Sequence, residues 1–89
     1  MQAIQARALE VPTSLVVACH AWMHAICNFL PHCNPHIQLD AKAGMHLLAG
    51  AARAAYQTVL VNHPTEEQKQ ALVPLLTDVQ RMEAEILEL

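Results

Sequence analysis

Apolar residues that recur every three or four positions most constrain what this chain can fold into. Between positions 72 and 89 their spacing is +3, +4, +3, +4 and +3, in the order Leu72, Leu75, Val79, Met82, Ile86 and Leu89. This spacing places apolar side chains on one face of a helix that packs against another helix, and its phase continues past Pro74. Two earlier stretches carry similar seams: Leu15, Cys19, Trp22, Ile26 and Phe29, and then Ala41, Met45, Leu48, Ala52, Ala55 and Val59. The pattern predicts an all-α protein.

The signals that begin and end helices divide the chain into three or four of them. Residues 2–10 can form a short helix that stops before Pro12, and a second helix can run from Thr13 or Ser14 to about residue 30. Prolines at 31 and 35 bracket a turn, so the third helix begins between residues 35 and 41 and ends near residue 62. Thr65 and Gln68 match a capping box that opens the last helix. With 89 residues, the chain is expected to form one small helical bundle spanning 1–89.

The scarcity of charge predicts a surface that another protein covers. Hydrophobic residues make up 54% of the chain and charged residues 15%, and the 29 residues between Glu10 and Asp40 carry no formal charge. On a small monomer this would expose a large apolar patch. We therefore expect a homodimer or higher oligomer, or else a monomer that keeps this surface for another protein. The expected contact residues are Trp22 and Phe29, with Leu75, Val79, Met82 and Ile86 as anchors if the last helix self-associates.

Several classes of function receive little support from the sequence. The five basic residues are scattered and the net charge is −3, which argues against nucleic-acid binding. Residues 13–30 would span about 27 Å as a helix, but two histidines and an asparagine interrupt them and no basic cluster flanks them, which argues against a membrane span. Three unpaired cysteines favour the cytoplasm. No glycine-rich phosphate loop is present, and no carboxylate stands in the sequence near the cysteine–histidine pairs, so no enzyme is predicted.

A cluster of histidine and cysteine suggests a metal site as an alternative. Residues 17–38 hold four histidines and all three cysteines. His20 lies about 15 Å along a helix from residue 30, too far to share an ion with the turn. The best tetrahedral set for zinc is therefore His24, Cys27, Cys33 and His36. In the competing interpretation, His20, His24 and Asn28 form a polar stripe on the solvent face of the helix, and no cofactor is bound.

The sequence thus favours a small non-enzymatic protein that binds another protein through its apolar seams, as a regulator, inhibitor or adaptor. The first alternative is a metal-binding or metal-sensing module that uses the cluster at 24–36. The second is an oligomer that sequesters a small ligand, although no particular residue of the sequence indicates such a site.

Overall fold

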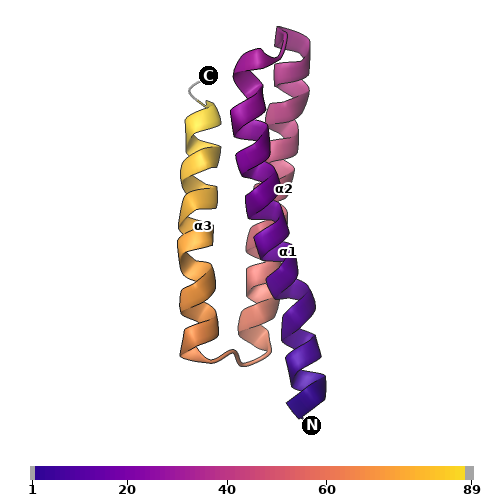
Figure 1. The fold of residues 1–89 in the computed structure, drawn as a ribbon, viewed down its shortest axis with the longest axis vertical. Helices are drawn as coiled ribbons and strands as arrows, with labels where there is room; N and C mark the ends of the chain where they lie inside the picture. Colours follow the sequence, from indigo (N-terminus) through magenta and orange to yellow (C-terminus); the bar gives the residue numbers. More distant parts are fainter. Residues whose placement is uncertain (1, 88–89) are drawn as a thin grey trace.

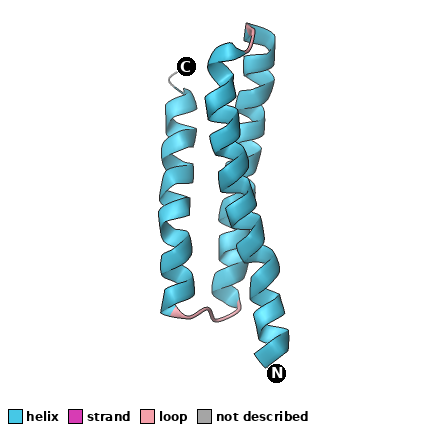
Figure 2. Ribbon diagram, in the orientation of Figure 1, coloured by secondary structure: helices cyan, strands magenta, loops and turns pink. Residues whose placement is uncertain are grey.

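Three long α-helices pack side by side, and the second runs antiparallel to the first and the third (Figures 1 and 2). The computed structural model describes residues 2–87 and contains α1 (Gln2–Phe29), a 3-10 turn (Leu30–His32), α2 (Pro35–Val61) and α3 (Glu66–Leu87). These residues include no strand, as the all-α prediction requires. The bundle is elongated, with principal extents of 51 × 18 × 16 Å, and the N-terminal end of α1 projects past the loop that joins α2 to α3 (Figure 1).

The prediction that a short first helix ends before Pro12 is wrong. Residues 2–29 form a single helix with Pro12 inside it. Proline removes one backbone hydrogen bond from a helix interior, here the bond to the carbonyl of Ala8. Pro12 is itself buried and continues the heptad spacing between the buried Leu9 and Val16. Packing of this apolar face against α2 and α3 offsets the lost hydrogen bond, so the helix continues.

Side-chain caps open the helices that follow both interhelical turns. The backbone N–H of Ile37 donates to Oδ1 of Asn34 at 3.0 Å, which makes Asn34 the cap of α2 and Pro35 its first residue. Ahead of α3, the N–H of Thr65 donates to Oε1 of Gln68 at 2.7 Å, and the N–H of Gln68 donates to Oγ1 of Thr65 at 3.1 Å. This reciprocal pair is the capping box expected from the sequence.

The core of the bundle is built from one seam on each helix. The α3 seam is as predicted from Leu72 to Ile86, because Leu72, Val79, Met82 and Ile86 are buried and Leu75 is half-buried, and Leu89 lies outside the described residues. Alanines dominate the α2 seam, and small side chains allow helices to approach closely. The buried residues of α2 are Met45, Ala49, Ala52, Ala55 and Val59.

The prediction for the α1 seam is confirmed at Cys19 and wrong at three other positions, where the buried residue is the next one along the chain: Val16, Met23 and Leu30 in place of Leu15, Trp22 and Phe29. Val16, Cys19 and Met23 are buried, whereas the side chains of Trp22 and Phe29 are 64% and 62% exposed. Trp22 and Phe29 therefore lie outside the core, on the surface between α1 and α2. The sequence interpretation followed the largest apolar side chains, whereas the core uses smaller ones.

Part of α1 also meets the length and hydropathy expected of a membrane-spanning helix. The segment Arg7–His32 contains an 18-residue window with a mean hydropathy of 1.3, and 22% of that window is buried within the bundle. The core helices of soluble proteins and signal sequences meet the same criterion, so a single such helix is weak evidence for a membrane.

Candidate functional site

Two clusters of polar side chains flank the buried seam of α3. One joins α3 to α1 through Asp78, and the other joins α3 to α2 through Glu83. Each cluster pairs one of these carboxylates with histidine from the neighbouring helix. Asp78 lies one residue before Val79 and Glu83 lies one residue after Met82, so each carboxylate borders the core on its own side.

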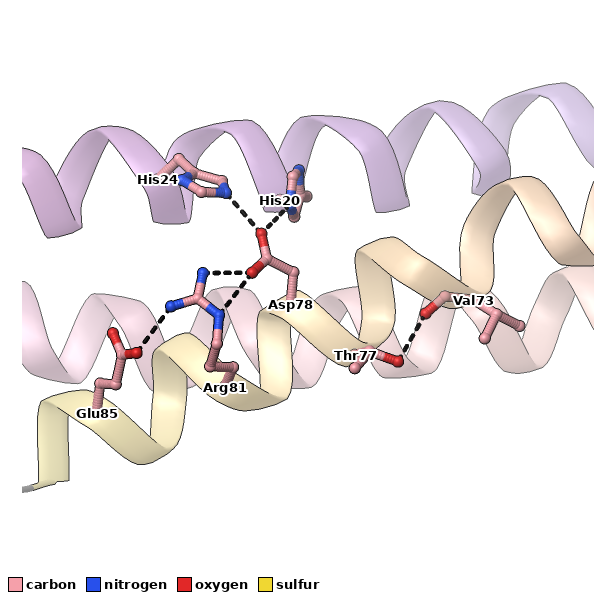
Figure 3. A network of polar contacts seen from close by, with 7 residues as sticks. All are labelled: His20, His24, Val73, Thr77, Asp78, Arg81 and Glu85. Carbon is pink, nitrogen blue, oxygen red and sulfur yellow. Dashed lines mark hydrogen bonds and ion pairs between the residues drawn. The ribbon is translucent and has the colours of Figure 1, made fainter.

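The cluster between α1 and α3 converges on a single oxygen atom. Nε2 of His20 and Nε2 of His24 donate to Oδ2 of Asp78 at 2.7 and 2.6 Å (Figure 3). The two histidines are one turn apart on α1, and their rings meet edge to face with centroids 4.6 Å apart. The His20 side chain is 19% exposed and that of His24 is 46% exposed. The arrangement is thus partly shielded by the helices and open to solvent at His24.

Arg81 occupies the other oxygen of the same carboxylate. Its Nε donates to Oδ1 of Asp78 at 2.9 Å, its Nη2 contacts the same oxygen, and its Nη1 donates to Glu85 at 2.7 Å (Figure 3). The hydrogen bonds from His20, Arg81 and His24, in decreasing order of effect, hold the pKa of Asp78 well below its usual range. Asp78 is therefore ionised at neutral pH, with Oδ1 held by Arg81 and Oδ2 directed at the two imidazoles.

The cluster between α2 and α3 has a linear arrangement. Nδ1 of His46 donates to Oε2 of Glu83 at 2.6 Å, and Nη1 of Arg53 donates to Oε1 of Glu83 at 3.0 Å. The hydrogen bond from His46 is the main reason that the pKa of Glu83 lies below its usual value, and Arg53 contributes in the same direction against partial burial. Nε2 of His46 has no hydrogen-bond partner among the residues that the structure describes.

Each carboxylate also borders an open groove. The groove beside Glu83 has a volume of about 540 Å³, and it is lined in addition by Arg53, Tyr56, Val73, Leu76, Thr77 and Gln80. The groove beside Asp78 has a volume of about 590 Å³, and His20, Pro74, Leu75 and Arg81 are among its lining residues. The first groove is the more polar in its side chains, and therefore the better suited to a small polar molecule.

The structure brings only His24 of the four predicted metal ligands into a ligand cluster. Within residues 2–87, the one group of three or more closely spaced ligand atoms is formed by His20, His24 and Asp78, which lie within 4.8 Å of one another. Cys27, Cys33 and His36 are outside it. Sγ of Cys33 instead donates to the carbonyl of Phe29 at 3.5 Å. Burial is the main cause that raises the pKa of the Cys27 thiol, which disfavours the thiolate that metals bind.

His20 and His24 do not form the solvent-facing stripe that the sequence suggested as the alternative. They flank the true α1 seam, directly after Cys19 and Met23, and contact α3. Asp78 was missed because it is 58 residues from His20 and 54 from His24. The sequence feature that could have identified Asp78 is its position directly before Val79 of the α3 seam, which places its carboxylate at the border of the core.

The predicted interface residues divide between the core and the surface. Val79, Met82 and Ile86 pack inside the bundle with Met23 and Met45. Leu75 packs against a second part of the core that includes Val16 and Val59. Trp22 and Phe29 remain exposed.

The chain is thus an all-α three-helix bundle with histidine–carboxylate clusters at two of its helix interfaces. Residues 1–81 match the family model described as formiminotransferase-cyclodeaminase. The chain therefore belongs to the formiminotransferase-cyclodeaminase family. No curated protein and no solved structure matches it significantly.

Family membership bears directly on the predicted function. Both words of the family description denote enzymes, so the expectation of a non-enzymatic regulator is not supported. The expectation that the chain is not an enzyme conflicts with the same description, because the family is named for two enzymatic activities. Family membership alone does not show that these 89 residues are themselves catalytic. That step is argued below from the polar side-chain clusters.

Proposed function

We propose that the chain acts on a formimino group, with the groove between α2 and α3 as the substrate site. The proton-transfer residue is His46, which does not itself line the groove but is hydrogen-bonded to the groove residue Glu83. The family description names two reactions, transfer of a formimino group and ring closure with loss of ammonia. The observation that carries the assignment to this groove is the His46–Glu83 pair, with 2.6 Å between Nδ1 and Oε2.

The chemistry of deaminating ring closure needs proton transfer and no redox step. A nitrogen of the substrate attacks the formimino carbon, and a carbon–nitrogen bond forms. The bond from that carbon to the terminal nitrogen breaks, and this nitrogen leaves as ammonia. The formimino group reacts in its protonated form, C=NH₂⁺, so its terminal nitrogen already carries two hydrogens. The attacking N–H loses a proton and the leaving nitrogen gains one, and the positive charge stays on the ring that forms. One imidazole can perform both transfers, because it accepts and donates protons near neutral pH.

His46 has the arrangement that this role requires. Glu83 accepts the Nδ1 proton and thereby fixes the tautomer in which Nε2 of His46 is the base. In the other cluster, the Nε2 atoms of both histidines are directed at Asp78 instead. The His46 side chain is 42% exposed, which allows a substrate to approach.

The remaining polar residues of the groove suit recognition of the substrate. Arg53 uses Nη1 for Glu83, and its other N–H groups can bind an anionic part of the molecule. The Tyr56 hydroxyl and the Gln80 amide line the same groove and offer further hydrogen bonds.

The test is ammonia release by the intact chain from an N-formimino compound that carries a second nucleophilic nitrogen. We expect His46→Gln to lower the rate by about 100-fold or more, as is usual for loss of a general acid–base group. Glu83→Gln should lower it too, because the tautomer is no longer fixed. His63→Gln is the matched control, since His63 lies in the turn between α2 and α3 and is not the histidine paired with Glu83, and it should leave the rate unchanged.

Two results would overturn the proposal. One is the absence of ammonia release from the folded chain. The other is release that is equally fast in His46→Gln, because the reaction would then not depend on this imidazole.

We further propose that two copies of the chain associate through the face between α1 and α2. Two grooves lie along this face, and neither is lined by a charged side chain. One, of about 320 Å³, is lined by residues that include Trp22, Ile26, Phe29 and Ile37. The other, of about 420 Å³, is lined by Val11, Pro12, Leu15 and residues of α2.

A second copy is the occupant that this face fits best. A twofold interface places the same patch of one copy against itself in the other, so an uncharged face meets an uncharged face. Two α1–α2 hairpins would then pack as four helices and cover Trp22 and Phe29.

Sedimentation equilibrium tests this association. We expect a mass twice the 9.8 kDa of one chain, and a single-chain mass for Trp22→Lys. Leu39→Lys is the matched control, because Leu39 is 66% exposed and lies outside both grooves. A monomer at high concentration would refute the proposal, and so would a monomer that sediments with lipid vesicles.

A further inference from the structure

The cluster between α1 and α3 directs three ligand atoms at one point. Nε2 of His20, Nε2 of His24 and Oδ2 of Asp78 lie within 4.8 Å of one another and come from two helices held by the core (Figure 3). Cys19 and Met23, which precede the two histidines, are buried, and so is Val79, which follows Asp78. The backbone beneath all three ligands is therefore fixed by packing.

We propose that His20, His24 and Asp78 bind a divalent transition-metal ion, with Zn²⁺ as the best fit. Two imidazoles and one carboxylate form a set of three protein ligands, which in zinc proteins leaves a fourth position for water or a substrate. Histidines at i and i+4 on one helix are a common way to supply two of the three. Imidazole nitrogen selects zinc and its neighbours over Mg²⁺ and Ca²⁺, which prefer oxygen ligands.

The distances are close to those of such a centre. Oδ2 of Asp78 is 2.7 and 2.6 Å from the two Nε2 atoms, as hydrogen bonds require. Neighbouring ligand atoms of a tetrahedral zinc ion lie roughly 3.3 Å apart, so Oδ2 of Asp78 must separate from each of the two Nε2 atoms by about 0.7 Å. Small rotations of the His24 and Asp78 side chains provide this movement, because His24 is 46% exposed. The proton on each Nε2 moves to Nδ1 or to solvent when the metal binds.

Arg81 and Glu85 act as a second layer around the cluster. With neutral imidazoles, the formal charges of Asp78, Arg81 and Glu85 sum to −1, which favours a cation. Arg81 binds Oδ1 of Asp78 and leaves Oδ2 available to the metal. Such contacts orient ligating carboxylates in metal sites.

The test is a calorimetric titration of the metal-free chain with Zn²⁺. We expect one equivalent to bind, and the affinity to fall at least 10-fold in His20→Gln and in Asp78→Asn. Cys33→Ser and His36→Gln are the matched controls and should leave the affinity unchanged, since these residues belong only to the set expected from the sequence. If Asp78→Asn does not fold, His20→Gln decides the question alone.

Co²⁺ used in place of Zn²⁺ gives an independent measurement. Coordination by two nitrogens and an oxygen predicts visible absorption without the charge-transfer band of a cobalt–thiolate bond. The proposal is overturned if no metal binds, or if binding depends on Cys33 and not on His20. It is equally overturned by a thiolate band.

Discussion

Glu83 is the residue whose ionisation links the candidate catalytic pair to stability. The hydrogen bond from His46 lowers its pKa below the ordinary value of 4.5. A carboxylate with a lowered pKa in the folded state stabilises the fold fully above its ordinary pKa. That contribution is lost as the pH falls through the folded pKa. The partners are 42% and 51% exposed, so the contribution is modest, on the order of 1 kcal/mol or less.

We therefore predict a pH-dependent effect of Glu83→Gln. The substitution should lower the free energy of unfolding at pH 7, and the difference from wild type should shrink as the pH falls below 4.5. Urea unfolding at pH 7, 4.5 and 3 measures it. A difference that grows towards acid pH would contradict the assignment of the pKa shift.

His63 is the one non-glycine residue with a positive φ, 54°, in the part of the chain that the structure describes. It follows the C-terminal cap of α2, where glycine is favoured because it has no Cβ. His63→Gly should stabilise the chain by about 0.5–1 kcal/mol in urea unfolding. If the substitution destabilises the chain, the imidazole of His63 stabilises the fold by more than its positive φ costs.

At the scale of single helices, the sequence predicted α3 better than α1. The α3 seam obeys a strict heptad and its neighbours are polar, so only one face can be buried. In α1, apolar residues lie on several faces, and Trp22 competes with Met23 for the core. Periodicity alone does not resolve that choice, because it depends on the volume available between α1 and the alanines of α2.

The same displacement explains what was missed in the site. Once Cys19 and Met23 define the seam, His20 and His24 are flanking positions that face a neighbouring helix. The predicted seam was instead centred on Trp22, and relative to that seam the two histidines fall on the opposite, solvent-facing side of the helix. The pairing with Asp78 depends further on which helix lies beside which, and helix order is not encoded in spacing.

Pro74 lies inside α3 and leaves the carbonyl of Gln70 without its usual helical donor. Because Pro74 is exposed, Pro74→Ala restores the bond without opening a cavity, and should stabilise the chain by about 1–3 kcal/mol. Pro35→Ala is the matched control, since the first position of a helix needs no such donor. Thermal unfolding measures both, and equal effects of the two substitutions would refute the explanation.

At the scale of the whole molecule, three methionines fill the centre of a small core. Met23, Met45 and Met82 are almost completely buried and belong to one cluster. We predict that Met45→Ala destabilises the chain by about 2–5 kcal/mol, a large fraction of the stability of a domain this size. Leu47→Ala, at a 76% exposed position on the same helix, should have little effect. Comparable losses in urea unfolding would contradict the assigned core.

The two proposed sites give the two sides of α3 different chemistry, a cation site facing α1 and a proton-transfer pair facing α2. The most direct test is to record the imidazole NMR signals of the intact chain while Zn²⁺, and separately an N-formimino compound, are added. We expect Zn²⁺ to shift the signals of His20 and His24 and to leave His46 unchanged, whereas the formimino compound should shift His46 alone. If both additions shift the same histidines, or neither shifts any of these three, the division between the two sides is wrong.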